Sequence, residues 1–172
     1  MDKTANKPGR AFKVSPMAKS HGKDVIRIFN HYVMHSDAAY LEEPVSRAFF
    51  DRFSDMAQGY PAFCAHTQQG EFAGFAFLRA HQYLPAFART AVATCFLAPE
   101  HTRRGLGTLL YGMLFEQAVE KGVATVLANI HSANEASIRF HQKMGFAECG
   151  RFREIGVKSG RVFDVVWMQK FL

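Results

Sequence analysis

The stretch from residue 89 to residue 122 is the part of the sequence that most constrains the fold. Residues 89–98 are apolar and partly β-branched, and this pattern predicts a buried strand that runs into Pro99. A loop with glycines follows, and then a helix with one apolar stripe that ends near Gly122. The stripe consists of Leu106, Leu109, Leu110, Met113, Leu114 and Ala118. A buried strand joined so closely to an amphipathic helix indicates a sheet with helices packed on it.

The rest of the chain also alternates between strand and helix patterns. We expect strands at 11–17, 62–67, 71–81, 125–131, 146–157 and 161–169, and helices at 20–36, 44–58 and 134–143. The helix at 44–58 is predicted to begin at Pro44, where a missing N–H costs nothing. Turn signals lie at 68–70 and 159–160. The expected fold class is α/β (α+β), in a single domain at 11–172 behind a flexible tail at 1–10.

Composition limits the classes to which the chain can belong. It has 172 residues, of which 48% are hydrophobic, and this is enough for one core. No apolar run approaches the roughly 20 residues of a membrane helix, and the polar start lacks the apolar stretch of a secretory signal. Cys64, Cys95 and Cys149 are odd in number and lack metal-site spacing, so we expect free thiols, no metal and a cytoplasmic location. Cys95 is expected in the core rather than as a nucleophile.

The loop before the helix at 106 is a candidate anion site. The segment 94–107 reads TCFLAPEHTRRGLG, so Gly105 and Gly107 open the helix and Arg103 and Arg104 precede it. Free N–H groups at a helix N-terminus bind anions, glycine allows close approach, and the arginines add positive charge. The alternative is an ordinary tight turn with solvated arginines. The net charge of +6 also favours polyanions, but the basic residues are scattered and no nucleic-acid motif is present, so we expect no nucleic-acid partner.

A second informative segment, 134–146, reads NEASIRFHQKMGF. Asn134, Ser137, Ile138 and His141 recur at helical spacing and share one helix face. Asn134 is a good N-cap, and that structural role competes with a role in binding. His141 is interpreted either as a half-buried histidine with its hydrogen bonds satisfied or as a proton donor near neutral pH.

Together these segments resemble the GNAT acetyltransferase superfamily, in which a loop of form [QR]-x-x-G-x-[GA] binds the pyrophosphate of coenzyme A. Within it the chain is most similar to the phosphinothricin and amino-acid N-acetyltransferase group, because that group carries N-x-x-S-I-x-x-H-x-K-x-G-F and later G-R-x-x-D-V-V-x-M-Q. The matching positions are Asn134, Ser137, Ile138, His141, Lys143, Gly145 and Phe146, then Gly160, Arg161, Asp164, Val165, Val166, Met168 and Gln169. Glu43 and Pro44 resemble the T-E-P turn of the group. The resemblance implies a mostly antiparallel central sheet in which the fourth strand splays from the fifth.

The resemblance also implies a site. Acetyl-CoA would be the cosubstrate and a small-molecule amine the acceptor, with direct attack of the amine in a ternary complex, and relatives of this kind are often homodimers. The expected cofactor-binding residues are Phe96, Leu97, Arg103, Arg104, Gly105, Leu106, Gly107, Thr108, Asn134 and Lys143. His141 stands where many relatives have a tyrosine that protonates the departing thiolate, so we expect it to be the general acid.

Two positions depart from the pattern of the group. Thr102 stands where the loop usually begins with Gln or Arg, which should matter little because Arg103 and Arg104 are adjacent. The strand glutamate that serves as the base in the group corresponds to Val92 here. Glu43 is the first candidate for the base and His81 the second, and a water relay is the third.

The acceptor is expected to be a small α-amino acid or an analogue of one. The aromatic loop at 83–87 either lines its pocket or belongs to the core. Three alternatives stay open: an acetyltransferase for a protein N-terminus or lysine, an inactive acyl-CoA-binding sensor, and a basic nucleic-acid-binding module.

Overall fold

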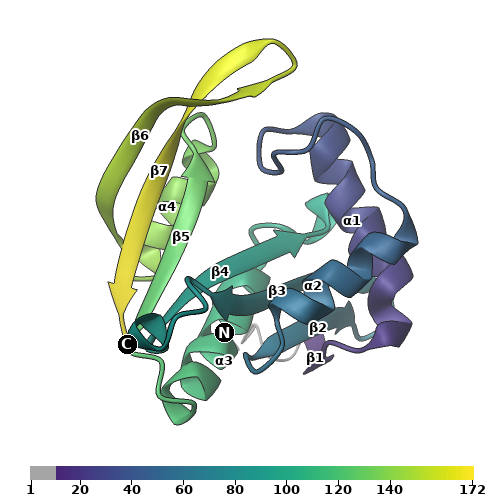
Figure 1. The fold of residues 1–172 in the computed structure, drawn as a ribbon. Helices are drawn as coiled ribbons and strands as arrows, with labels where there is room; N and C mark the ends of the chain where they lie inside the picture. The colour runs from purple at the N-terminus through teal and green to yellow at the C-terminus, as the bar shows by residue number, and fades with distance from the viewer. Residues whose placement is uncertain (1–10) are drawn as a thin grey trace, which may run out of the picture.

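A computed structural model describes residues 11–172 of the protein, so the tail expected at 1–10 lies outside the described residues. A seven-stranded sheet runs through the molecule in the order β1-β2-β3-β4-β5-β7-β6 (Figure 1). The strands are β1 (Phe12–Pro16), β2 (Ala62–Thr67), β3 (Phe72–Ala80), β4 (Thr90–Leu97), β5 (Thr125–His131), β6 (Ala147–Lys158) and β7 (Arg161–Phe171). β4 and β5 are parallel, and the other five neighbouring pairs are antiparallel.

Helices cover both faces of the sheet. They are α1 (Gly22–His35), α2 (Phe50–Met56), α3 (Leu106–Glu120) and α4 (Glu135–Lys143), with single 3₁₀ turns at Lys19–His21, Arg47–Phe49, Pro85–Phe87 and Pro99–His101. α1 and α2 lie on one face and α3 and α4 on the other (Figure 1). Among the described residues, no helix combines the length and apolarity that crossing a bilayer requires. The predicted fold class, a mixed and mostly antiparallel sheet flanked by helices, is confirmed.

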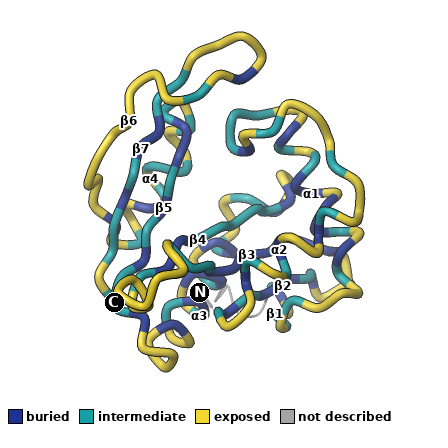
Figure 2. Tube along the Cα trace, viewed as in Figure 1, coloured by how far each residue is buried: buried dark blue, intermediate teal, exposed yellow. Residues whose placement is uncertain are grey.

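Side-chain alternation along β3 explains why two cores form. Phe75 and Phe77 pack toward α1 and α2, whereas Ala76 and Leu78 pack toward α3. All four side chains are fully buried, as expected for a strand with helices on both faces. Figure 2 shows that β3 is buried, whereas the outer strand β6 is exposed.

The prediction of a helix at 44–58 is partly wrong. The helix α2 begins at Phe50 after the 3₁₀ turn Arg47–Phe49, and Pro44 lies in an extended segment. Asn30 on α1 holds that segment, because its Nδ2 donates to Val45 O at 2.8 Å and its Oδ1 accepts from Val45 N at 2.9 Å. The side chain of Asn30 therefore occupies the Val45 carbonyl, which a helix that began at Pro44 would offer to the N–H of Phe49.

The β6–β7 hairpin extends well beyond the rest of the sheet (Figure 1). Its turn is Ser159-Gly160, as predicted, and both residues have positive φ, 50° and 71°. Positive φ at both central positions is the geometry of a type I′ turn, which matches the twist of the two long strands.

Candidate active site

A gap between β4 and β5 is the main feature of the candidate site. The two strands pair only at their beginnings, where Thr90 meets Thr125 and Val92 meets Leu127. From there β5 follows β7 to its end at His131, while β4 follows β3 to Leu97. The strands therefore diverge, as Figure 1 shows, and each leaves a backbone edge facing the gap. We call this the β4–β5 slot, defined by Ala93–Leu97 on one side and Ala128–His131 on the other.

Phe96 and Leu97, which were predicted to pair with the cofactor, lie in the open part of β4. Both are half-buried. The Tyr32 hydroxyl of α1 donates to the Leu97 carbonyl at 2.7 Å, and burial raises the pKa of Tyr32 to about 12, so it is a neutral donor. The ring of Phe29 packs edge-on against Phe96 at 5.4 Å. α1 thus fixes the position of the end of β4.

The loop after β4 leads into the N-terminus of α3. Arg103 has φ 56° and Gly105 has φ 81°, so the chain turns sharply before the helix begins. Gly107 lies against α4, and a Cβ there would meet the Phe140 ring at 3.1 Å. The first amides of α3 have no carbonyl one turn earlier to bind, which leaves them for an anion. The residues at 103–108 therefore fit a pyrophosphate by backbone amides, positive charge and lack of side-chain bulk.

Arg104 is fixed by a cluster that sequence reasoning missed. Its Nη1 donates to Nδ1 of buried His101 at 3.0 Å, and its guanidinium lies over the Phe12 ring at 5.4 Å. Since Nδ1 accepts from arginine, the ring hydrogen of His101 is on Nε2, which lies 3.3 Å from Glu71 Oε2. Glu71, Glu100 and His101 bring three potential metal-ligand atoms within 4.8 Å of one another. Nε2 of His101 is buried and has no hydrogen-bond partner among the described residues, so its contact with Glu71 is a close approach and not a hydrogen bond. With the ring hydrogen on Nε2 and a guanidinium adjacent, this cluster suits an orienting role for Arg104 rather than a cation site.

The segment at 134–146 forms α4 as predicted, and Asn134 is its N-cap. The Asn134 Oδ1 accepts from Ser137 N at 3.1 Å, which is the structural role that competed with a binding role. Its amide nitrogen is the group that it can still offer to a cofactor. Lys143 is exposed in the last turn of α4.

His141, the predicted general acid, lies between α3 and α4. It is buried, its Nδ1 donates to the Ser137 carbonyl at 2.8 Å, and its Nε2 accepts from the Tyr111 hydroxyl at 2.8 Å. Burial lowers the pKa of His141, and burial holds the pKa of Tyr111 well above its usual value. Both side chains are therefore neutral near pH 7, and both imidazole nitrogens are engaged. Nε2 can carry a proton toward a thiolate only after the bond from Tyr111 opens.

The candidates for the base lie apart from one another. Val92, at the position of the glutamate of the resembled group, is buried where the slot begins. Glu43 is exposed in the loop between α1 and α2. His81 follows β3 and packs edge-on against Trp167 at 6.2 Å.

In the aromatic loop at 83–87, Tyr83 is 86% exposed, so the alternative that this loop belongs to the core is wrong.

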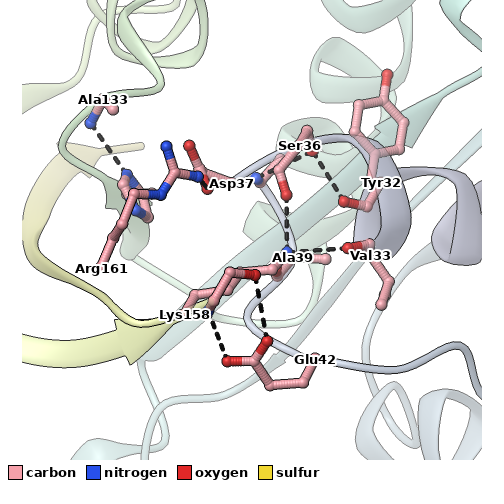
Figure 3. Close-up of polar contacts among 12 residues, drawn as sticks. Tyr32, Val33, Ser36, Asp37, Ala39, Glu42, Ala133, Lys158 and Arg161 are labelled. Carbon is pink, nitrogen blue, oxygen red and sulfur yellow. Dashed lines mark hydrogen bonds and ion pairs between the residues drawn. The ribbon is translucent and has the colours of Figure 1, made fainter.

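The loop after α1 is clasped to the tip of the β6–β7 hairpin, which no sequence signal had indicated. Lys158 is 5% exposed, and its Nζ donates to the carbonyls of Val33 at 3.0 Å, Ser36 at 2.7 Å and Ala39 at 2.7 Å. These carbonyls belong to the last turn of α1 and the loop behind it, where the helix dipole favours a cation. Figure 3 shows Lys158 among them.

Further contacts of the hairpin tip lie beside the Lys158 bonds. Glu42 accepts from Ser159 N at 2.8 Å, and Phe163 lies between Tyr40 and His131, with ring centroids 5.5 Å and 4.3 Å away. The clasp thus joins two segments that lie far apart in the sequence, since Glu42 and Ser159 are separated by 117 positions.

Comparison with known proteins agrees with this geometry. The sequence model of the Acetyltransferase (GNAT) family matches residues 26–146, which include the slot, the loop at 103–108 and α4. The chain belongs to the GNAT acetyltransferase family. It is 29% identical to a phosphinothricin N-acetyltransferase of Streptomyces coelicolor, over 95% of this chain and 98% of that protein. It is 32% identical to an L-methionine sulfoximine/L-methionine sulfone acetyltransferase of Pseudomonas paraeruginosa, over 84% of this chain and 86% of that protein.

A solved structure shares the fold over nearly the whole GNAT chain. The phosphinothricin acetyltransferase of Sinorhizobium meliloti, in complex with AcCoA, superposes with a TM-score of 0.88 at 27% identity, covering 94% of this chain and 89% of that one. The predicted resemblance is confirmed, and with it the activity class: the protein is an acetyl-CoA-dependent N-acetyltransferase. The residues at 103–108 and the β4–β5 slot fit that cosubstrate.

Proposed function

We propose that this GNAT enzyme acetylates the α-amine of a free amino acid or a close analogue of one. Two curated relatives are named for phosphinothricin and for methionine sulfoximine or sulfone, and each aligns with more than four-fifths of the chain. Phosphinothricin and methionine sulfoximine are α-amino acids with a polar, tetrahedral side-chain group. The substrate class that these relatives share is therefore the first to test.

The single structural observation that supports acetyl transfer is the divergence of β4 and β5 beside the N-terminus of α3, because it suits binding of acetyl-CoA. Acetyl-CoA supplies an activated acetyl thioester when bound. We infer that Phe96 and Leu97 offer their backbone to its pantetheine arm, and that Arg103, Arg104 and the amides of Gly105 to Thr108 bind its phosphates. Asn134 and Lys143 flank this path from α4. The amine then attacks directly, because no nucleophilic side chain is needed for acyl transfer between bound partners.

Proton transfer is the least constrained part of the proposal. We retain His141 as the general acid on two conditions: the bond from Tyr111 opens, and Nε2, which carries no hydrogen while it accepts that bond, takes up a proton. Glu43 is the first candidate for the base, ahead of His81. The exposure of Glu43 leaves it free to approach an acceptor at the α1–α2 loop. An amine with a low pKa needs no enzymatic base, since bulk water then takes its proton.

We also propose that the enzyme is a cytoplasmic homodimer. All of β6 except Gly156 and Lys158 is exposed. The hairpin presents four apolar side chains that are each more than half exposed: Phe152, Ile155, Val157 and Val162. An apolar strand face of this kind is commonly covered by a second copy. Sedimentation analysis of the wild type and of a variant with Ile155→Lys and Val157→Lys would test this.

The experiment for the proposed function follows free CoA with a thiol reagent while acetyl-CoA is offered with different amines. The panel holds methionine sulfone, methionine sulfoximine, phosphinothricin, proteinogenic amino acids, polyamines and short peptides. We expect amine-dependent CoA release with the amino acids and their analogues. Release with peptides alone would move the assignment to a protein substrate. Tight binding of acetyl-CoA without release for any amine would indicate a sensor, because cofactor binding would then be present without transfer.

A further inference from the structure

Arg79, near the end of β3, differs from every other arginine that the structure describes. It is half-buried, whereas all the other described arginines are exposed. Its side chain lies on the sheet face that carries α1 and α2, because side chains alternate along a strand and Phe75 and Phe77 pack toward those helices (Figure 1). The pairing of β3 with β4 keeps its register from Gly74 to Ala80, so the alternation holds up to Arg79. Arg79 therefore lies on the opposite face of the sheet from α3, whose N-terminus is the proposed phosphate site.

Arg79 lies at the closed end of the β4–β5 slot. Its partner on β4 is Val92, which is also the last residue of β4 that pairs with β5, at Leu127. The slot begins at the next residue, Ala93. Side chains of directly opposite residues lie on the same face of a sheet and close together, so Arg79 and Val92 are neighbours on the face of α1 and α2.

The face of α1 and α2 is also the side from which an acceptor can reach the slot. The apolar core under α3 extends to β5 and β7. Among the described residues, the core under α1 and α2 contains no residue of either strand. The helices on that face therefore stop at β4, and an acceptor that enters beside them lies next to Arg79 at the end where the slot closes.

The charge of Arg79 has no counter-charge among the described residues. No ion pair within residues 11–172 includes it, and its one hydrogen bond there is a long contact of 3.4 Å from Nη1 to the Ala80 carbonyl. Burial lowers the pKa of Arg79, because the protein solvates the cation less well than water does. The guanidinium nevertheless stays charged, and it has five N–H donors. A half-buried cation of this kind favours an anionic ligand, which supplies the missing counter-charge.

The distance along the slot indicates which group of an acceptor Arg79 can reach. Phe96, where we expect the pantetheine arm, lies four residues beyond Val92, or about 13 Å at roughly 3.3 Å per residue. The amine must lie at the thioester, and the α-carboxylate of an amino acid is bonded to the same carbon as the amine. The end of the side chain extends several bonds farther, toward the closed end of the slot. Arg79 is therefore placed to bind a group on the side chain of the acceptor.

We propose that Arg79 determines acceptor specificity by binding an anionic group on the side chain of the acceptor. This inference rests on the proposed function and narrows it to a preference for amino acids with an acidic side chain. The substrates named in two relatives form a matched pair of ligands. Phosphinothricin and methionine sulfone have side chains of the same length that end in a methylated tetrahedral group, a phosphinate in the first and a sulfone in the second. Only the phosphinate carries a negative charge.

The test is calorimetric titration of phosphinothricin and of methionine sulfone into enzyme saturated with CoA, which carries no acetyl group and cannot react. We expect the wild type to bind phosphinothricin tighter by roughly 10–100-fold, the value of a charge-assisted contact. In Arg79→Gln this preference should fall to about one, and Arg79→Lys should keep part of it. Arg153→Gln is the matched control and should keep all of it, because Arg153 is an exposed arginine on β6, at the far edge of the sheet.

Three further measurements separate loss of binding from other effects. Arg79→Met keeps the apolar stem of the side chain, so it replaces Arg79→Gln if the CD spectrum shows that Arg79→Gln does not fold. Affinity for acetyl-CoA should stay the same in both variants, because Arg79 lies on the opposite face from α3. The carboxamide of methionine sulfone lacks the α-carboxylate, and its affinity relative to the acid should not change when Arg79 is replaced.

The inference is overturned if the wild type does not bind phosphinothricin more tightly than methionine sulfone, or if a folded variant without the charge of Arg79 keeps the full preference. Weaker binding of acetyl-CoA in that variant would assign Arg79 to the cofactor path, and a changed ratio of acid to carboxamide would assign it to the α-carboxylate; either result also overturns the inference. The proposed function fails separately, namely if the ligands bind as expected but acetyl-CoA yields no acetylated product from either. Acetylation of both without a preference in binding defeats the inference alone.

Discussion

The buried pair of Tyr111 and His141 gives a prediction whose size follows from the structure. In His141→Leu the Tyr111 hydroxyl loses its acceptor while 1% exposed, and in Tyr111→Phe the Nε2 of His141 loses its donor. Each unsatisfied buried group costs about 1–3 kcal/mol of unfolding free energy. The double variant leaves neither group unsatisfied, so both penalties are absent and its cost should fall below the sum of the single variants by about 2–6 kcal/mol.

Urea denaturation of the wild type and the three variants at about pH 8, where histidine is neutral, measures these costs. Because a loss of about 2 kcal/mol lowers Tm by roughly 4–8 °C in a protein of this size, thermal denaturation offers a second reading. Additive costs in the double variant would refute the hydrogen bond as the source. The kcat of the same variants distinguishes a catalytic from a structural role of His141. If His141 is the general acid, kcat should fall by a factor of about 10²–10⁴ in His141→Leu and by far less in Tyr111→Phe.

The pair also predicts how stability depends on pH. Burial depresses the folded-state pKa of His141 below its ordinary 6.5, so the unfolded chain takes up the proton first as the pH falls. The stability that neutral His141 contributes is complete above pH 6.5 and is lost as the pH falls below that value. The cost of His141→Leu should therefore be smaller at about pH 5 than at about pH 8. An equal cost at both values would show that the histidine does not titrate differently in the two states.

Three further predictions concern the walls of the slot and its surroundings. Arg104→Gln should raise KM for acetyl-CoA about tenfold while the CD spectrum is unchanged, because one charge-assisted phosphate contact is lost; an unchanged KM would remove Arg104 from the cofactor site. Gly74→Ala places a Cβ 2.8 Å from the Phe96 carbonyl oxygen, so β4 must shift. We expect the free energy of unfolding to fall by about 1–3 kcal/mol and acetyl-CoA to bind more weakly in a titration. Unchanged stability and unchanged binding would show that β4 moves without cost. Asn30→Ala should cost about 1–3 kcal/mol in urea denaturation because Val45 loses two hydrogen bonds, and a neutral effect would mean that water replaces them.

The sequence was sufficient where structure depends on neighbours along the chain. Three such features lie within about 30 residues and are found as predicted: the strand at 89–98, the glycine turn at 105 and the apolar helix stripe from Leu106 to Ala118. Each is signalled by the periodicity of apolar residues or by a turn residue. The N-cap at Asn134 and the turn at Ser159-Gly160 are local in the same sense. These signals were enough to locate the loop that joins the end of β4 to the N-terminus of α3.

The features that sequence reasoning missed depend on distant contacts. The helix start at Phe50 rather than Pro44 is set by Asn30 on another helix. Lys158 is a charged residue in a hairpin and carries no mark of burial in the sequence, yet it ends among carbonyls about 120 positions earlier in the chain. The hydrogen bond from Tyr111 to His141 likewise joins two helices and determines whether the imidazole can act as an acid. Residue type and spacing identify candidates, but only packing decides which of their atoms are free.

We conclude that this enzyme transfers acetyl from acetyl-CoA, and we propose an amino-acid-like amine as the acceptor. The most direct measurement quantifies N-acetylmethionine sulfone by mass spectrometry and free CoA by thiol titration in the same reaction. We predict that both rise together in equal amounts and only when enzyme and methionine sulfone are both present. Release of CoA without the acetylated amine, or acetylation restricted to peptide substrates across the panel, would contradict the claim.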